Sequence, residues 1–187
     1  IAELWPELKA PIFASPFATE LILNKLSSLP WAQQVPIYTI HFQQRIAIGE
    51  FNVTWLPMTH SIPEASALLI ETEVGNVLHT GVWKIDAQPV IGKPFCQSCF
   101  SELKALPVDV MVADSTNATK TESSVSESAV YPGLLKTVQA QTGRVVVTCF
   151  SSNVARLITL AKVAKKTKRR CAVFGRSMEN MVSVVRR

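Results

Sequence analysis

The sequence predicts a mixed α/β chain made of two units, and three observations carry that prediction. Residues 1–118 contain short apolar runs separated by turn residues, which is typical of strands and hairpins. Residues 119–187 alternate apolar runs with helical patterns, which predicts a parallel sheet covered by helices. The net charge changes from −5 in the first part to +10 in the second, across the polar segment 116–128. Because the chain is 48% apolar and only 18% charged, a disordered protein is excluded.

Most of the first unit is expected to form strands. Gly49-Glu50 separates two strand-like runs and residues 73–75 separate two more, so both positions predict hairpins. Apolar spacing close to the helical period predicts helices at 17–28 and 98–105. The expected strands are 35–40, 45–48, 51–56, 67–72, 76–80 and 109–113.

The second unit is expected to alternate helices and strands. Its expected elements are a helix at 126–141, a strand at 144–150, a helix at 153–166, a strand at 171–174 and a helix from residue 178. Two parallel strands are too few for a stable sheet, so we expect this unit to be completed elsewhere. The first residue is not Met, and we therefore expect the chain to be a fragment. The absence of a signal-like or membrane-spanning segment predicts a cytoplasmic protein that does not bind membranes.

The four cysteines are expected to be reduced. Cys149 and Cys171 lie in apolar runs, where buried free thiols are the usual state. Cys96 and Cys99 form one CxxC, but a structural zinc site needs a second pair of ligands, and the sequence has none at zinc-site spacing. A metal or redox role for the CxxC is the alternative.

Two residues that follow predicted strands are candidates for chemistry. His60 lies in a Thr-His-Ser loop after the strand at 51–56, where a rigid scaffold could hold a reactive group. Asp114 begins the string DSTN after the strand at 109–113, and the end of such a strand is where these sheets bind ligands. An ordinary Asx turn is the alternative for Asp114. His41 and His79 are expected to be structural.

The second unit places polar side chains at the starts of two predicted helices. Ser152 and Asn153 follow the strand at 144–150, and Arg176 and Ser177 follow Gly175. Free backbone amides at a helix start, with hydroxyl groups and one arginine, favour a phosphate. Together with the +10 charge, this pattern predicts a nucleic-acid surface. Ordinary helix capping and a solvated basic helix are the alternatives.

Several long motifs resemble one known family. The string VTWLPMTHSIPEASALLIETEVGNVLHTGVWKID is followed in order by VDVMVADSTNA, GRVVVTCFSSNVARL and CAVFGRSM, and PIFASPFATELI precedes them. Together they resemble ribonuclease J, the bacterial β-CASP branch of the metallo-β-lactamase superfamily. The resemblance implies a partial metallo-β-lactamase domain of α+β sandwich type at 1–118. It also implies the start of a parallel-sheet α/β β-CASP domain at 119–187.

The resemblance also implies an activity and roles for residues. In that family two zinc ions activate a water that attacks an RNA phosphodiester, in 5′-to-3′ exonuclease and endonuclease reactions. His60 would be a zinc ligand, and Asp114, the catalytic candidate, would lie at the entrance to the β-CASP domain. The RNA cleft would be lined by Ser152, Asn153, Arg176 and Ser177. RNA is then the partner, and the full-length protein is expected to be a homo-oligomer.

The sequence departs from the family at the metal centre. The bridging aspartate of the family follows His-Thr-Gly, and here that position is Val82, which has no oxygen to hold a metal. His60 is the only zinc ligand of the family that the chain retains, so we expect it to be inactive in isolation. One alternative is a degenerate, non-catalytic RNA-binding paralogue that has lost the metal centre. A small-molecule hydrolase of metallo-β-lactamase type is a second alternative.

Overall fold

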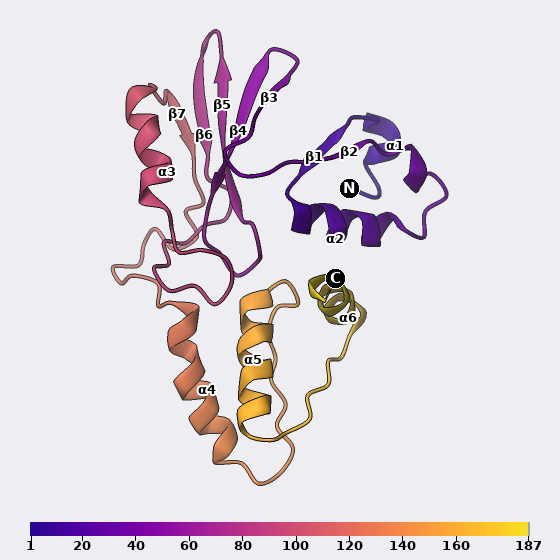
Figure 1. The fold of residues 1–187 in the computed structure, drawn as a ribbon, viewed down its shortest axis with the longest axis vertical. Helices are drawn as coiled ribbons and strands as arrows, with labels where there is room; N and C mark the ends of the chain where they lie inside the picture. The colour runs from indigo at the N-terminus through magenta and orange to yellow at the C-terminus, as the bar shows by residue number, and fades with distance from the viewer. Residues whose placement is uncertain (187) are drawn as a thin grey trace.

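The computed structural model describes residues 1–186, apart from the side chains of Glu102 and Lys104. Arg187, the last residue of the predicted second unit, lies outside the described residues. The ribbon shows a twisted sheet at one end of the molecule, α4 and α5 at the other, and α6 next to α2 (Figure 1). None of the helices within the described residues is long and apolar enough to cross a membrane.

The main sheet has five strands in the order β3-β4-β5-β6-β7. Neighbours from β3 to β6 are antiparallel, whereas β6 and β7 are parallel. The strands are β3 (Arg45–Ile48), β4 (Phe51–Pro57), β5 (Ser66–Thr72), β6 (Gly75–His79) and β7 (Val110–Val112). All five lie where the sequence predicts strands, within one or two residues at each end.

Both predicted hairpins are present. Ile48 pairs with Phe51 across the first turn, where Gly49 has a φ of +60° that favours glycine. Thr72 pairs with Gly75 across the second turn. These pairings fix the register of the sheet and decide which side chains face each core.

The sheet separates two apolar cores, and β4 contributes to both. Trp55 packs with Val53 and Ile40 on one face, whereas Leu56 packs with Ala67 and Leu69 on the other. Trp55 and Leu56 are neighbours in the sequence, and successive residues of a strand point to opposite faces. The Leu56 face is covered by Phe100 and Leu103, which belong to α3 (Gln97–Ser101) and the 3-10 helix η2 (Glu102–Ala105).

The N-terminal segment forms a small layer of its own. It contains α1 (Trp5–Leu8), β1 (Ile12–Ala14), α2 (Pro16–Leu26), η1 (Ala32–Gln34) and β2 (Ile37–Thr39). β1 and β2 pair in parallel, and α2 contacts α6 from the far end of the chain (Figure 1). The helix predicted at 17–28 is therefore confirmed as α2, whereas the sequence analysis did not predict α1 or β1.

In the second unit the helices are confirmed and the strands are not. The structure contains η3 (Glu127–Ala129), α4 (Val130–Gln139), α5 (Val154–Lys166) and α6 (Arg176–Val185). The strands predicted at 144–150 and 171–174 are wrong, because neither segment has strand pairing in the described residues. Both segments instead line an apolar cavity of about 470 Å³ with α5 and α6. Only some of their apolar side chains face this cavity, whereas Val146, Phe150 and Phe174 are exposed. Neither segment joins a parallel sheet in the part of the chain that the structure describes.

The cysteines also differ from expectation. Cys96 and Cys99 form a disulfide, so the prediction that this pair is reduced is wrong. Cys149 and Cys171 are free, as predicted, but Cys171 is exposed and Cys149 is only partly buried. Their segments are not the buried strands that the prediction assumed.

Candidate functional site

The sheet topology brings three motif positions to one edge. β4 and β6 are each antiparallel to β5, and β7 is parallel to β6, so β4, β6 and β7 all end at the same edge. His60 follows the end of β4, Val82 follows the end of β6 and Asp114 follows the end of β7. The prediction that His60 and Asp114 lie at strand ends is thus confirmed, and the two charges influence each other.

His60 is half-buried beside a small cavity of about 70 Å³. Its Nδ1 atom lies 3.2 Å from the hydroxyl oxygen of Ser61. Burial lowers the pKa of His60 below its ordinary value, the charge of Asp114 opposes that shift, and the charge of Lys84 reinforces it. A neutral imidazole at pH 7 follows, which is the form that can bind a metal ion.

Asp114 is held as a carboxylate by its own turn. Its Oδ1 atom accepts hydrogen bonds from the hydroxyl group and the backbone N–H of Thr116, the latter at 3.1 Å. These two hydrogen bonds lower the pKa of Asp114; slight burial opposes them and the charge of His60 adds to them. Its backbone N–H donates to the Thr80 hydroxyl at 3.2 Å, which ties the turn to the end of β6. Asp114 therefore forms the Asx turn that was the alternative expectation, and it also lies at the sheet edge where a ligand was expected.

The edge does not offer a two-metal centre. Val82 is 61% exposed at the position where a bridging carboxylate would be needed, and its side chain has no donor atom. No group of three or more His, Cys, Asp or Glu side chains within the described residues could hold a metal ion. His60 and Asp114 supply two donors at this edge and Val82 supplies none, so the described residues do not fit a pair of zinc ions.

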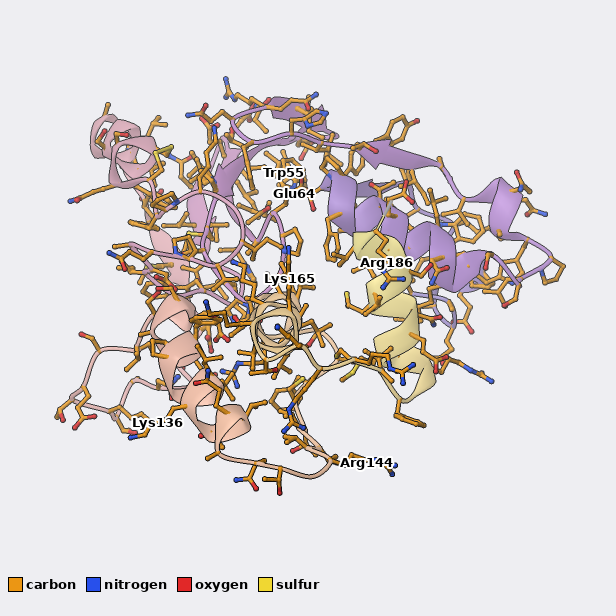
Figure 2. The ribbon with its side chains drawn as sticks, turned by 60° about the horizontal axis from the view of Figure 1, so that its bottom comes forward. Trp55, Glu64, Lys136, Arg144, Lys165 and Arg186 are labelled. Carbon is orange, nitrogen blue, oxygen red and sulfur yellow. A yellow bond between two sulfur atoms is a disulfide. The ribbon has the colours of Figure 1, made fainter. Side chains whose placement is uncertain are left out.

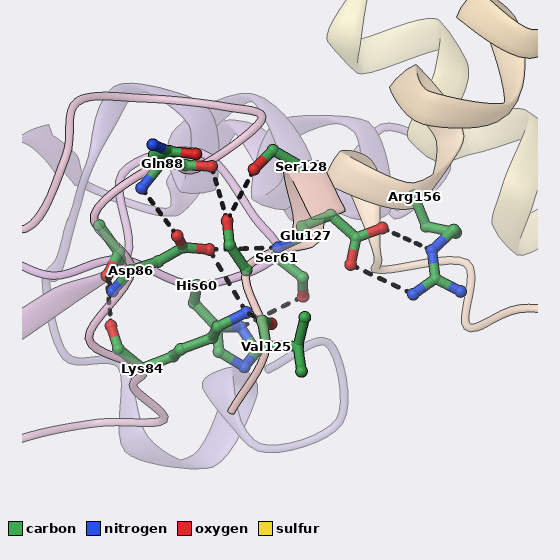
Figure 3. Close-up of polar contacts among 11 residues, drawn as sticks. His60, Ser61, Lys84, Asp86, Gln88, Val125, Glu127, Ser128 and Arg156 are labelled. Atoms are coloured by element: carbon green, nitrogen blue, oxygen red, sulfur yellow. Dashed lines mark hydrogen bonds and ion pairs between the residues drawn. The ribbon is translucent and has the colours of Figure 1, made fainter. Parts of the chain in front are cut away.

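A buried carboxylate organises the loop next to His60 (Figure 3). Asp86 is 5% exposed, and its two oxygens accept from the N–H of Gln88 at 2.9 Å and of Glu127 at 3.3 Å. Lys84 lies 3.3 Å from Asp86 Oδ2 and also donates to the Val125 carbonyl at 2.6 Å. Burial raises the pKa of Asp86, but hydrogen bonding from Ser126, the two backbone N–H groups and the charge of Lys84 together hold it below its ordinary value.

An ion pair and a backbone hydrogen bond join α5 to the same loop (Figure 3). Arg156 meets Glu127 through both Nε and Nη2, the latter at 3.2 Å from Oε2. The hydrogen bond to Glu127 raises the pKa of Arg156, burial opposes it, and the charge of Glu127 adds to it. The N–H of Ala155 donates to the Ser61 carbonyl at 3.0 Å. The first turn of α5 therefore lies directly against the His60 loop.

The four candidate phosphate-binding residues lie at the starts of two helices, as predicted. Asn153 caps α5, and its side chain accepts from the Arg156 N–H at 2.8 Å, while Ser152 is exposed. Arg176 and Ser177 form the exposed first turn of α6 after Gly175, whose φ is +101°. No hydrogen bond or ion pair in the part of the chain that the structure describes joins the two pairs. Asn153 shows the capping role, and phosphate binding stays a prediction.

Sequence reasoning missed most of the polar network. Lys84 and Asp86 stand in the string VWKID directly after Val82, and Glu127 stands beside a predicted helix start. The charged pair Lys84 and Asp86 stands inside an apolar string, and that pattern is the sequence signal that could have indicated these two residues. Glu64 was also missed: its Oε2 atom accepts from the Phe17 N–H at 2.7 Å and so caps α2. His79 is exposed and its Nδ1 accepts from the Gly81 N–H at 3.1 Å, which supports a structural role.

The structure is a mixed α/β chain in which His60 and Asp114 follow strands at one edge of the sheet. The loop that carries His60 contacts α5 of the basic helical unit. Known proteins match this chain. Residues 142–187 match the family model described as Ribonuclease J, beta-CASP domain. The resemblance to ribonuclease J that the motifs indicate is thereby confirmed, and it extends over nearly the whole chain in the relatives below.

The relatives that match this chain are longer than it is. It is 39% identical to "Ribonuclease J" of Sinorhizobium meliloti over 184 residues, covering 98% of this chain and 33% of the relative. It is 34% identical to "Ribonuclease J" of Helicobacter pylori over 185 residues, covering 98% of this chain and 27% of the relative. A crystal structure of a protein of unknown function from Enterococcus faecalis has the same fold, with a TM-score of 0.62, 17% identity, and coverage of 94% of this chain and 43% of that one. The chain thus spans a third or less of these ribonuclease J relatives.

Proposed function

We propose that this chain is part of a ribonuclease J-type hydrolase that acts on RNA. The observation that carries the proposal is that β4 and β7 place His60 and Asp114 at one sheet edge, with the His60 loop against the first turn of α5. In this arrangement the sheet edge supplies the side of the site where hydrolysis would occur. The basic helical unit supplies the side that holds the RNA, which agrees with the +10 charge of residues 119–187.

The basic side chains of the second unit are spread over several elements (Figure 2). Lys136 lies on α4, Arg144 on the segment after it, Lys165 at the end of α5, and Arg186 directly after α6. The last turn of α5 carries Lys165 and Lys166, and the helix has 13 residues, so these lysines lie about 15 Å from its first turn. We propose that RNA phosphates bind along this surface, with Ser152, Asn153, Arg176 and Ser177 contacting phosphates nearer the site.

The metal chemistry of this family is proposed only for a chain with a complete centre. In a chain with a complete centre, two zinc ions would supply an activated water for 5′-to-3′ exonuclease and endonuclease reactions on RNA. Here His60 would be one ligand, but Val82 leaves the bridging position without an oxygen. Since the residues present do not fit a pair of metals, we propose that this chain alone does not cleave RNA.

The valine at position 82 also supports a second candidate function. Val82 would also be expected in a degenerate paralogue that keeps the RNA surface and has lost the metal centre. Its role would then be RNA binding without hydrolysis. The two proposals differ in what a longer protein containing this chain would do. The first proposal requires that protein to cleave RNA once it has its remaining metal ligands, whereas the second requires that it does not cleave RNA.

Binding to a fluorescein-labelled, unstructured RNA of about 20 nucleotides tests the shared claim. Fluorescence anisotropy should show an affinity that falls steeply between 50 and 200 mM salt, as expected when lysines and arginines replace counterions. The affinity should not change when a chelator is added, because the basic surface needs no metal. Affinity that is independent of salt, or absent at low salt, would contradict the proposal.

A further inference from the structure

The Cys96–Cys99 disulfide is the one motif of the chain that the proposed function leaves unexplained. The two cysteines are three positions apart, at the start of α3, and both are half-buried. A disulfide that closes so short a loop restricts the unfolded chain little, so stabilising the fold is a weak reason for it. The CxxC spacing is instead typical of thiols that exchange electrons with other thiols.

The atoms around Cys96 favour its sulfur as the leaving group when the disulfide is opened. The N–H of Cys99 donates to Cys96 Sγ at 3.3 Å, and the Ser98 hydroxyl lies 3.3 Å from the same atom. Both groups can stabilise negative charge on that sulfur. Among the side chains that the structure describes, Cys99 Sγ accepts a hydrogen bond from Gln43 Nε2 at the longer distance of 3.9 Å. The two sulfurs are therefore unequal.

The residues on either side of the disulfide connect it to both the core and the polar network. Phe95 stacks on Phe100 with ring centroids 5.4 Å apart, and these rings directly flank the two cysteines. Phe100 packs on the core of Leu56, and the Phe95 N–H donates to the Asp86 carbonyl at 3.0 Å. The CxxC turn therefore holds the far end of the loop that begins at Asp86.

We propose that Cys96 and Cys99 form a reversible thiol–disulfide site whose reaction partner is a dithiol. One thiolate of the dithiol attacks Cys99 Sγ, the Cys96–Cys99 bond breaks, and Cys96 Sγ keeps the electron pair and takes a proton. The second thiol of the dithiol then attacks the mixed disulfide and releases Cys99 as a thiol. The cysteines gain two electrons and two protons, and the dithiol leaves as a disulfide. Reduction removes the covalent constraint on the turn, which positions the Phe95 N–H to donate to the Asp86 carbonyl.

Thiol labelling of the full chain tests the site. In a Cys149→Ser/Cys171→Ser background only this pair can react with a maleimide tag. Native protein treated with oxidised glutathione should take up no tag, dithiothreitol should expose two, and fresh oxidised glutathione should restore protection. Two tags under both conditions would overturn the proposal, as would protection from dithiothreitol that is lost only on unfolding. The Cys96→Ser/Cys99→Ser variant is the matched control, because its Cys171 should be tagged under both conditions.

Hydrogen exchange tests the link to Asp86. The Phe95 amide should exchange several-fold faster after reduction, and equally fast in the Cys96→Ser/Cys99→Ser variant whatever the redox buffer. The Ile70 amide, in the middle of β5, should not change. Equal Phe95 rates in oxidised and reduced protein would overturn the coupling. These measurements involve no RNA, so their failure is distinct from failure of the proposed function.

Discussion

The backbone N–H of Ala155 donates to the carbonyl oxygen of Ser61 at 3.0 Å, and Ser61 directly follows His60 in the sequence. This bond joins the first turn of α5 to the loop that carries the histidine, across 94 positions of sequence. Arg156, the next residue, holds Glu127 in a two-point ion pair. The Ala155–Ser61 bond thereby fixes α5 against the sheet edge, and the ion pair fixes α5 within the basic unit.

Removing the ion pair should loosen α5 more than the sheet. Glu127 and Arg156 side chains are 15% and 28% exposed, so Glu127→Gln should lower the free energy of unfolding by roughly 1 kcal/mol. Hydrogen exchange should accelerate in the first turns of α4 and α5 and stay unchanged in β4 and β5. Glu122→Gln, at an exposed position outside the network, is the matched control. Equal effects of the two substitutions would show that the pair does not hold α5.

Asp86 should be the most sensitive position of the polar network. Asp86→Ala leaves the N–H groups of Gln88 and Glu127 without their acceptor and leaves Lys84 without its partner, so we expect a loss of roughly 2–3 kcal/mol. Denaturant unfolding monitored by far-UV circular dichroism measures the loss. A change within 0.5 kcal/mol, the scale of ordinary surface substitutions, would contradict the role given to this carboxylate.

The lowered pKa of Asp86 predicts how the stability of the fold depends on pH. Its pKa is lower in the folded chain than the ordinary value of 3.8, so the unfolded chain binds protons first as the pH falls. The stabilisation is present above that value and is lost as the pH falls from about 4 through the lower folded pKa. Unfolding curves between pH 6 and pH 2 should show this decline, and Asp86→Asn should reduce it. An unchanged decline in the variant would assign the effect to other groups, of which Asp114 is one because its pKa is also lowered.

The lysines at the end of α5 should account for part of the salt dependence of RNA binding. Lys165→Glu/Lys166→Glu should weaken RNA binding and lower the slope of log affinity against log salt by about 1–2, since each lost phosphate contact contributes roughly 0.7 for a single strand. Lys25→Glu, at the end of α2 in the acidic unit, should leave the slope unchanged. Equal slopes for all three proteins would place the RNA elsewhere.

The main sheet could be predicted from the sequence because its signals are local. Alternating residues such as Val53 and Trp55, with glycine at position 49 in the hairpin turn, specify strands and their pairing within a few positions. The segments 144–150 and 171–174 were predicted wrongly because a continuous apolar run indicates burial and not hydrogen-bond pairing. Here both segments line the cavity beside α5 and α6 and leave Val146, Phe150 and Phe174 exposed, which the sequence pattern does not distinguish from a strand in a sheet.

The candidate site could be predicted only where it lies at strand ends. His60 and Asp114 each follow a strand, and the direction of β4 and β7 then places both at one edge. The contact between Arg156 and Glu127 could not be predicted, because it joins residues 29 positions apart that meet only when η3 and α5 pack together. The contact between Asp86 and the Glu127 N–H could not be predicted either.

The most direct test of the account is to measure bound zinc and RNA cleavage for the chain and for its Val82→Asp variant. The unaltered chain is expected not to retain two zinc ions and not to cleave RNA, because no group of three metal-binding side chains lies within the described residues. Val82→Asp should bind zinc at least tenfold more tightly, since a third donor then lies at that edge, whereas Val74→Asp in the turn between β5 and β6 should not. Two tightly bound zinc ions and RNA cleavage by the unaltered chain would contradict the account.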